Sequence, residues 1–276
     1  MLCFCCSVAC FGVVFCIFFF GVACFFGSVF FSTITGFSIL AQKESSPAKI
    51  KEYLGKIQSS GELLSSLLND TLTISKASAG KLELHAENSD TISLVNSVMI
   101  PVREAAAAKN ISCTCTVHPG FPDTLIVDRL ALQKILLNLL SNAVKYTDSG
   151  GHVSLSLSVE NKTDDGTAPY ETFTVRDDGA GISPEFLPYI YEPFSQEHAP
   201  GTDASGTGLG LSIVKELVNS MNGTITVESR QNEGSVFSVH LHLNKADTSI
   251  TAPLSPPADS TDFLSGKKIL LCEDNG

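Results

Sequence analysis

Charge is missing from the first 42 residues of this sequence, which contain no Asp, Glu, Lys or Arg. Basic charge is also scarce overall: across 276 residues, 18 Lys and Arg stand against 29 Asp and Glu, a formal charge of −11. A protein of that sign repels a phosphate backbone, so we expect no nucleic-acid partner. The length suggests one or two domains with a sizeable core.

Paired metal ligands are missing as well. Six of the nine cysteines lie within the first 31 residues, but Cys3, Cys5 and Cys6 are too closely spaced for zinc-binding CxxC pairs, and no His accompanies them. Cys113 and Cys115 lie two apart in an alternating run. Buried thiols on one face of a strand are the simplest interpretation of that pair.

The segment 1–31 is apolar, and its residues 2–31 exceed the ~20 residues that span a bilayer. Nothing basic precedes it and four lysines follow, which would make the chain membrane-associated with the rest in the cytoplasm (Lys43, Lys49, Lys51 and Lys56). A signal peptide is disfavoured because no basic leader precedes so long a run. The alternative is a wrongly placed gene start, in which case the protein would be cytoplasmic.

A long helix is expected from about Pro47 to Ser78, where apolar residues recur at helical spacing. Ser46 and Pro47 make a suitable N-cap and first turn, and Gly80 supplies a stop. The apolar stripe can bury against a helix of this chain or of another. Lys81–Leu84 then alternates as a short strand does.

The segment 81–244 has the pattern of an α+β domain. Helices are expected at 92–108, from Asp128 as a cap to about 147, and at 209–221. Strands are expected at 111–117, 125–127, 153–159, 173–176, 224–228 and 234–243. These elements predict a two-layer sandwich, with helices on one face of a mixed, largely antiparallel sheet.

The helix that follows Asp128 carries polar residues at a spacing that suggests a ligand. Asn138 and Asn142 are four apart and project from one stripe, and Lys145 follows three residues later. Two amide oxygens and an ammonium there would suit a metal-bound polyphosphate. The alternative is an amphipathic core helix whose Asn residues are merely solvated.

Two glycine-bearing loops follow in the sequence. In Asp177–Ile182, Gly179 and Gly181 would permit a close approach of a ligand, and the Asp177 carboxylate could accept from the exocyclic amine of adenine. An ordinary Asp-Gly turn is the alternative. The second loop, Gly206–Ser212, runs into a helix, whose N-terminal amides would suit phosphate. Between them, 192–205 reads as a lid anchored by Phe194.

Four stretches in fixed order carry a family resemblance: Asn138-x3-Asn142-x2-Lys145-Tyr146, Asp177-x-Gly179-x-Gly181, Glu192-Pro193-Phe194 and Gly206-x-Gly208-x-Gly210. Together they resemble the N, G1, F and G2 boxes of the sensor histidine kinase ATP-binding domain, a Bergerat-fold member of the GHKL superfamily. The resemblance covers about residues 32–276 and implies a kinase that uses ATP and Mg²⁺.

By that resemblance, Asn142 coordinates Mg²⁺ and Asn138 and Lys145 complete the catalytic set. Asp177 would bind the adenine amine, Tyr146 would pack near adenine or ribose, and Phe194 would couple the lid to the helical segment. The implied nucleotide-binding residues are Asn138, Asn142, Lys145, Tyr146, Asp177, Gly179, Gly181, Phe194, Gly206, Thr207, Gly208, Leu209, Gly210 and Leu211.

Position 138 separates the activities within that superfamily. Chaperone and topoisomerase relatives carry a Glu there as the general base for water, and the amide of Asn138 cannot take that proton. A kinase needs no such base, because a neutral imidazole is already nucleophilic, and positioning with charge neutralisation supplies most of the catalysis. The sequence therefore favours a kinase over a hydrolase.

One part of the family pattern is missing. Residues 32–80 resemble part of the helical hairpin through which such kinases form homodimers and which carries the phosphoacceptor His, but the first His of this chain is His85. We expect a chain that binds ATP and phosphorylates a histidine it does not contain. The alternative is a non-catalytic dimerisation or regulatory module that binds ATP without transferring phosphate.

The C-terminal end resembles the start of another domain. Residues 245–266 are rich in Thr, Ser, Pro and Asp, as linkers are, and 267–276 read as a buried strand that ends in Glu273 and Asp274. That strand resembles the first strand of a response-regulator receiver domain. The resemblance implies a hybrid kinase of which this sequence is a part truncated at both ends, with a receiver domain as partner.

Overall fold

The computed structural model describes residues 30–160, 170–197 and 207–245, with side chains to 243. The apolar segment up to residue 29, most of the expected lid, the linker and the receiver-like strand lie outside the described residues. Within the part that is described, no helix is both long enough and apolar enough to cross a membrane.

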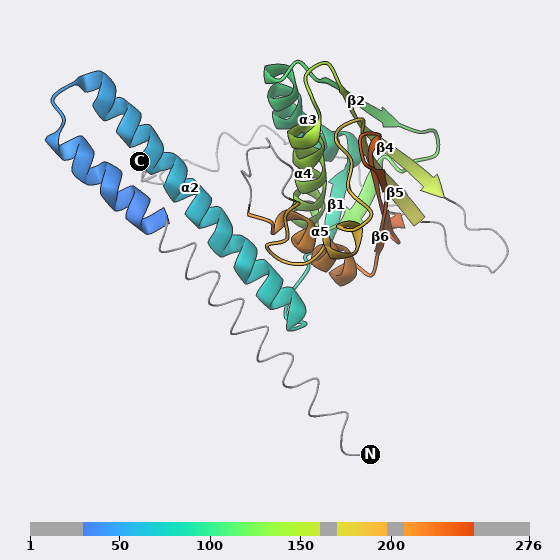
Figure 1. The fold of residues 1–276 in the computed structure, drawn as a ribbon. Coiled ribbons are helices and arrows are strands. Elements are labelled where there is room, and N and C mark those ends of the chain that lie inside the picture. Colours follow the sequence, from blue (N-terminus) through green and yellow to red (C-terminus); the bar gives the residue numbers. More distant parts are fainter. Residues whose placement is uncertain (1–29, 161–169, 198–206, 246–276) are drawn as a thin grey trace, which may run out of the picture.

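Two helices form a hairpin that extends away from the rest of the molecule (Figure 1). Residues 30–43 are helical, and α2 spans Pro47–Ser78, as predicted. Pro47 occupies the first turn, while the N-cap Ser46 makes no side-chain capping bond. The rings of Phe37 and Tyr53 stack between the helices, with centroids 5.8 Å apart.

The C-terminal half of α2 joins the hairpin to the domain. Leu67 and Ile74 are buried, and the Lys134 ammonium lies 2.9 Å from the Asp70 carboxylate. On its other faces α2 keeps large aliphatic side chains exposed, among them Leu54, Leu68 and Leu72. The exposed leucines thus form an apolar surface on the faces of α2 that do not pack against the domain.

The domain elements follow the predicted order with small changes at their ends. The helices are α3 (Thr91–Ala108), α4 (Arg129–Tyr146) and α5 (Gly210–Ser220), with a short 3-10 turn, η1 (Leu187–Tyr189). The strands are β1 (Glu87–Asp90), β2 (Ser112–Val117), β3 (Thr124–Val127), β4 (His152–Glu160), β5 (Tyr170–Asp177), β6 (Thr224–Arg230), β7 (Gly234–Leu241) and β8 (Asn244–Lys245).

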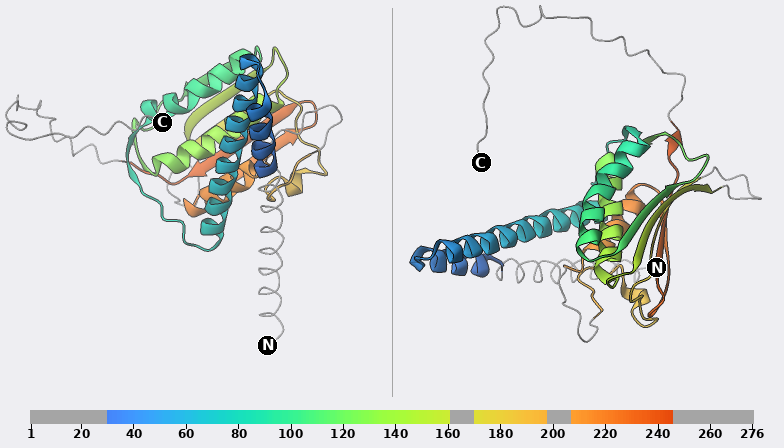
Figure 2. Two further views of the ribbon diagram at one scale, coloured as in Figure 1. Left: turned by 90° about the vertical axis from the view of Figure 1, so that its left-hand side faces the viewer. Right: turned by 90° about the horizontal axis from the view of Figure 1, so that it is seen from above.

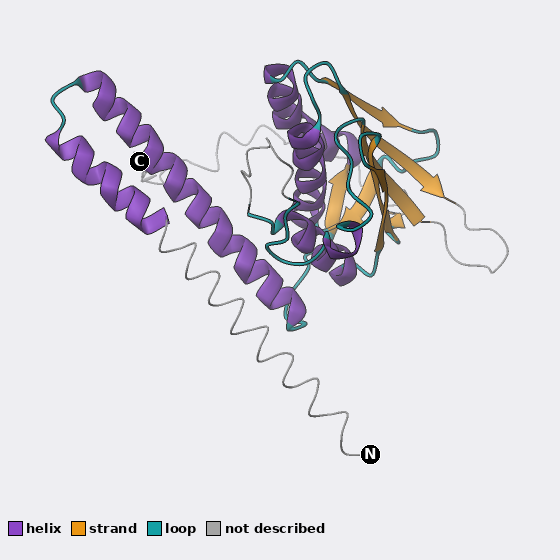
Figure 3. Cartoon of the chain, viewed as in Figure 1, coloured by secondary structure: helices purple, strands orange, loops and turns teal. Residues whose placement is uncertain are grey.

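Five strands form the main sheet in the order β2-β4-β5-β7-β6, and only the β2–β4 pair is parallel. Helices α3, α4 and α5 cover one face of this sheet, and no described helix covers the other face (Figures 2 and 3). A second, three-stranded sheet has the order β1-β3-β8. This is the predicted α+β sandwich, preceded by the helical segment.

The core lies between α4 and the sheet. Leu132, Ile135, Leu136 and Leu140 on α4 are fully buried, as is Phe173 on β5. Each such side chain stabilises the fold by about 1.5–3 kcal/mol relative to its exposed state. Because this face of α4 is committed to the core, its Asn residues project toward the opposite side.

One predicted strand is wrong. Residues 81–84 form no strand, and β1 begins at Glu87 instead, where it pairs with β3. The alternation at 81–84 is real, since Leu82 and Leu84 pack against the core. Those contacts arise without a ladder of hydrogen bonds. His85 is exposed in the same segment, and its amide donates to the Asp128 carboxylate at 2.9 Å.

Candidate functional site

Two Asn side chains on α4 lie beside the first residue of α5. Asp128 caps α4 as predicted, accepting from the amide of Ala131 at 2.8 Å. The amide nitrogen of Asn138 donates to the Lys134 carbonyl at 2.8 Å, which leaves its Oδ1 turned the other way. A Cβ on Gly210 would lie 2.8 Å from Asn138 Oδ1 and 3.9 Å from Asn142 Nδ2. Gly210 therefore leaves room for both amides at the start of α5.

Within the described part of the chain, no side chain caps the start of α5. Its N-cap, Leu209, provides no side-chain cap, and the Leu209 amide itself donates to Thr207 Oγ1 at 3.3 Å. The amides of the first helical turn have no partner within a helix and carry partial positive charge. The Leu209 side chain is fully buried, so only its backbone can contact a ligand, and Leu211 packs partly against the core.

Asp177 is a buried carboxylate at the end of β5. It shares a strand face with Phe173 and Val175, which explains its 7% exposure. Burial raises the pKa of the Asp177 carboxyl, opposed by the hydrogen bonds that it accepts from the backbones of Gly179 and Ser235. The Gly179 amide is 3.0 Å from its Oδ1.

The two glycines of this loop are required by contacts within the protein. A Cβ on Gly179 would lie 2.8 Å from the carbonyl carbon of Tyr146. Gly181 has φ +64°, and its Cβ would lie 2.7 Å from the carbonyl carbon of Arg230. The structure shows close approach to neighbouring backbone at both positions. The close approach to a ligand that the sequence predicts here stays a prediction.

The end of α4 lies against that loop. The Tyr146 carbonyl accepts from the Ala180 amide at 3.1 Å. The Lys145 ammonium lies 3.1 Å from the Tyr146 hydroxyl and 4.7 Å from the centre of its ring. The Tyr146 side chain remains 45% exposed. A cation and a ring thus lie together at the end of α4, where the backbone of Tyr146 meets Gly179.

The segment with Phe194 is tied to the second glycine loop. The Phe194 amide donates to the Gly208 carbonyl at 2.9 Å, and a Cβ on Gly208 would lie 2.7 Å from Phe194 Cα. Phe194 has φ +65° and Gly208 has φ +70°. A left-handed conformation costs a non-glycine residue about 1–2 kcal/mol, so this pairing is held by its surroundings. Gly206 lies outside the described residues.

Comparison with known proteins identifies this arrangement. Residues 127–245, which include every described residue of the two loops and of α4, match the family of histidine kinase-, DNA gyrase B-, and HSP90-like ATPases. The chain belongs to that family. More specifically, it carries a histidine-kinase-type ATPase domain.

Two relatives illustrate how far the similarity extends. Hybrid signal transduction histidine kinase L of Dictyostelium discoideum is 36% identical over 232 residues, 82% of this chain and 13% of that protein. Sensor histidine kinase GacS of Pseudomonas protegens is 32% identical over 243 residues, 88% of this chain and 26% of that protein. This chain thus spans about a quarter or less of the length of these two relatives.

A solved structure matches most of this chain in fold. Full-length ShkA, crystallised in complex with AMPPNP, matches with a TM-score of 0.62 and 26% identity, over 83% of this chain and 46% of that one. Histidine kinase AdeS of Acinetobacter baumannii matches in fold, with a TM-score of 0.57 at 21% identity, over 78% of this chain and 95% of that one.

The donor set of this histidine kinase-type domain suits a metal that arrives with its own ligands. Among the described residues, no three His, Cys, Asp or Glu side chains gather to hold a metal ion. Asn142 offers one amide oxygen, and Mg²⁺ readily keeps waters and phosphate oxygens as its other ligands. The Asn142 amide oxygen therefore suits a Mg²⁺ ion that is bound together with a nucleotide.

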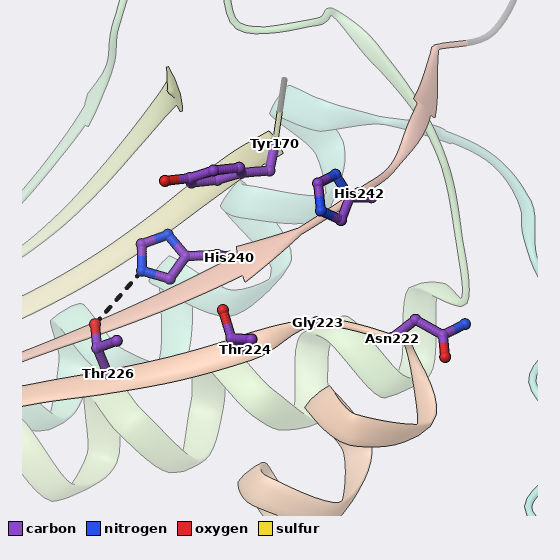
Figure 4. A pocket seen from close by; sticks show the side chains of 7 residues that line it. All are labelled: Tyr170, Asn222, Gly223, Thr224, Thr226, His240 and His242. Carbon is purple, nitrogen blue, oxygen red and sulfur yellow. Dashed lines mark hydrogen bonds between the residues drawn. The ribbon is translucent and has the colours of Figure 1, made fainter. Parts of the chain in front are cut away.

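A pocket of about 300 Å³ on the open side of the sheet is separate from this site. Figure 4 shows its lining: Tyr170, Asn222, Gly223, Thr224, Thr226, His240 and His242. His240 accepts or donates through both ring nitrogens, to Thr172 and Thr226, and its ring meets Tyr170 edge to face. None of the predicted nucleotide-binding residues lines it.

Sequence reasoning missed several residues that support the site. Thr147 bonds back to the Ala143 carbonyl at 2.7 Å, and Asp178 accepts from the His152 amide at 2.7 Å. Lys109 donates to the end of α4 from another helix. Burial raises the pKa of Tyr191 to about 12, and its hydroxyl has no hydrogen-bond partner in the described part of the chain. Asp178 lies within the predicted loop Asp177–Ile182 and Thr147 at the end of the helix predicted after Asp128, whereas Lys109 and Tyr191 lie in no predicted motif.

Proposed function

We propose that this chain binds Mg-ATP between α4 and α5 and transfers the γ-phosphoryl group to a histidine, as the catalytic part of a two-component hybrid histidine kinase. One observation carries the proposal: the Asn138 and Asn142 amides lie beside Gly210, at the uncapped start of α5. Amide oxygens and open helix amides meet at one place, which suits a phosphate chain with its metal.

Different groups would bind the two ends of the nucleotide. Asp177, buried and held by the Gly179 amide, would accept from the adenine amine, and Tyr146 would pack near adenine or ribose. The phosphates would lie toward Lys145 and the backbone of the loop that includes Thr207 and Gly208. AMPPNP bound to ShkA supports an ATP-like ligand for this fold.

The residues present fit phosphoryl transfer better than hydrolysis. The acceptor imidazole would attack the γ-phosphorus, the bond to the β–γ bridging oxygen would break, and ADP would leave. Mg²⁺, when bound through Asn142, would neutralise charge on the phosphate oxygens. Asn138 would hold the phosphates and metal in place. Its amide cannot take a proton from water, so it would not act as the general base of a hydrolase.

The acceptor would be a histidine supplied by another chain. The described helical hairpin, 30–43 and 47–78, contains no His. Its exposed Leu54, Leu68 and Leu72 would support homodimerisation, and the hybrid kinase relatives support a receiver domain as the next phosphate acceptor. The missing His also favours a second function, a regulatory module that binds ATP and transfers nothing.

Nucleotide titration tests the binding step. Calorimetry with ATP and Mg²⁺ should show binding by the native chain, and Asn142→Ala and Asp177→Asn should each abolish it. Asn69→Ala replaces an exposed Asn on α2, outside the predicted nucleotide-binding residues; it is the matched control and should bind like the native chain. Unchanged affinity in both site variants would contradict the proposal.

A further inference from the structure

The last carbonyls of α4 are satisfied by two different partners. Lys109 Nζ lies 2.8 Å from the Val144 carbonyl, 2.8 Å from the Lys145 carbonyl and 3.4 Å from the Thr147 carbonyl. The Tyr146 carbonyl, in the middle of this set, accepts from the Ala180 amide at 3.1 Å. A helix leaves its last four carbonyls without partners, so this end of α4 is completed from outside.

The geometry links Lys109 to the first glycine loop. Lys109 follows the last residue of α3, and its ammonium reaches across to α4. The Lys109 ammonium holds the carbonyls on both sides of Tyr146. The Tyr146 carbonyl is then directed at the Ala180 amide, and the Tyr146 backbone contacts Gly179. A positive charge here also complements the negative end of the helix dipole.

Other bonds keep the fold together without this side chain. The Gly150 amide donates to the Asn110 carbonyl, and the Ser112 amide donates to the Gly151 carbonyl, each at 2.9 Å. These backbone bonds fasten the turn after α3 to the turn after α4. Removal of the Lys109 charge should therefore loosen the end of α4 and leave the sheet intact.

We propose that Lys109 is a positioning residue of the nucleotide site, which fixes the end of α4 where Tyr146 meets Gly179 and Ala180. This inference rests on the proposed function and adds a residue outside its ligand set. Lys109 acts on the adenine side of the site, through the backbone of α4. Lys145, in contrast, would act on the phosphates through its own side chain.

Variants of Lys109 in the full chain test this role. Lys109→Met keeps the stem and removes the charge, and it should weaken ADP and ATP binding equally, by about 3- to 10-fold. Lys109→Arg should bind within about twofold of the native chain, because the cation is restored. Lys81→Met is the control, since the Lys81 side chain is exposed and makes no hydrogen bond or ion pair within the described residues. Lys145→Met should instead weaken ATP more than ADP.

Amide hydrogen exchange separates positioning from general stability. In Lys109→Met the Ala180 amide should exchange faster, while the amides of β5 should exchange as in the native chain. Native affinity for both nucleotides in Lys109→Met, or weaker affinity with faster exchange throughout β5, would overturn the inference. A native chain that binds neither nucleotide would instead overturn the proposed function.

Discussion

Gly210→Ala should separate nucleotide affinity from stability. Gly210 is the first residue of α5 and has no positive φ, so Ala at this position restricts the unfolded chain and gains about 0.4–1 kcal/mol of stability. The new Cβ would lie 2.8 Å from Asn138 Oδ1, so the amide must rotate away and lose its bond to the Lys134 carbonyl. That loss costs about 0.5–1.5 kcal/mol, so the free energy of unfolding should change by less than ~1 kcal/mol.

The effect on ATP binding should be much larger. A hydrogen bond to a charged group contributes about 1.5–3 kcal/mol, so displacing the Asn138 amide from the phosphates should weaken ATP by about 10- to 100-fold. Calorimetric titration measures the affinity, and thermal unfolding without nucleotide measures the stability.

Gly61→Ala is the matched control for this variant. Gly61 lies within α2, and a Cβ there meets nothing within 4 Å. The control should gain stability, by up to ~1 kcal/mol, and keep native affinity. Native ATP affinity in Gly210→Ala would refute the reasoning, because the contact between α4 and α5 would then lie off the nucleotide site.

Three further predictions follow from single contacts. Gly179→Ala should lower the free energy of unfolding by about 1–3 kcal/mol in urea denaturation, because its Cβ would lie 2.8 Å from the carbonyl carbon of Tyr146, and a native midpoint would contradict this. Burial raises the pKa of Asp177 from its ordinary value of 3.8. Without nucleotide, at a pH between that value and the folded-state pKa, the folded chain therefore holds a proton that the unfolded chain has released. Relative to Asp177→Asn, the native chain should therefore lose stability as the pH rises through the folded-state pKa, and parallel pH profiles of thermal unfolding would argue otherwise. Lys134→Ala and Asp70→Ala should show a coupling of about 0.5–2 kcal/mol in a double-mutant cycle, since the two charges lie 2.9 Å apart and partly buried, and additive effects would exclude the ion pair as a link between α2 and α4.

Periodicity predicted the elements whose burial is one-sided. The apolar spacing of α4 and the alternation of β4 and β5 survive in the structure because each buries one face against the same core. β1 was not predicted, since Glu87–Asp90 has no apolar alternation and becomes a strand through its pairing with β3. The alternation at 81–84 led to a wrong strand prediction, because Leu82 and Leu84 pack against the core without pairing with another strand.

The spacing of motifs predicted which site residues share an element, and the contacts between elements came only from the structure. Asn138 and Asn142 had to share a helix face, but their contact with Gly210 depends on how α5 packs on α4. The need for glycine at 179 and 181 comes from backbone that is distant in sequence. Lys109 belongs to no motif and meets α4 across 35 residues of sequence, so nothing local could indicate its role.

Phosphate transfer in trans tests the central claim most directly. The purified full chain would be incubated with γ-labelled ATP, Mg²⁺ and a separately purified kinase hairpin that carries a phosphoacceptor His, with the Asn142→Ala chain as control. The account predicts acid-labile label on the hairpin, none on this chain alone and none with the variant. Binding of ATP with no label on the hairpin, or acid-labile label on this chain by itself, would contradict it.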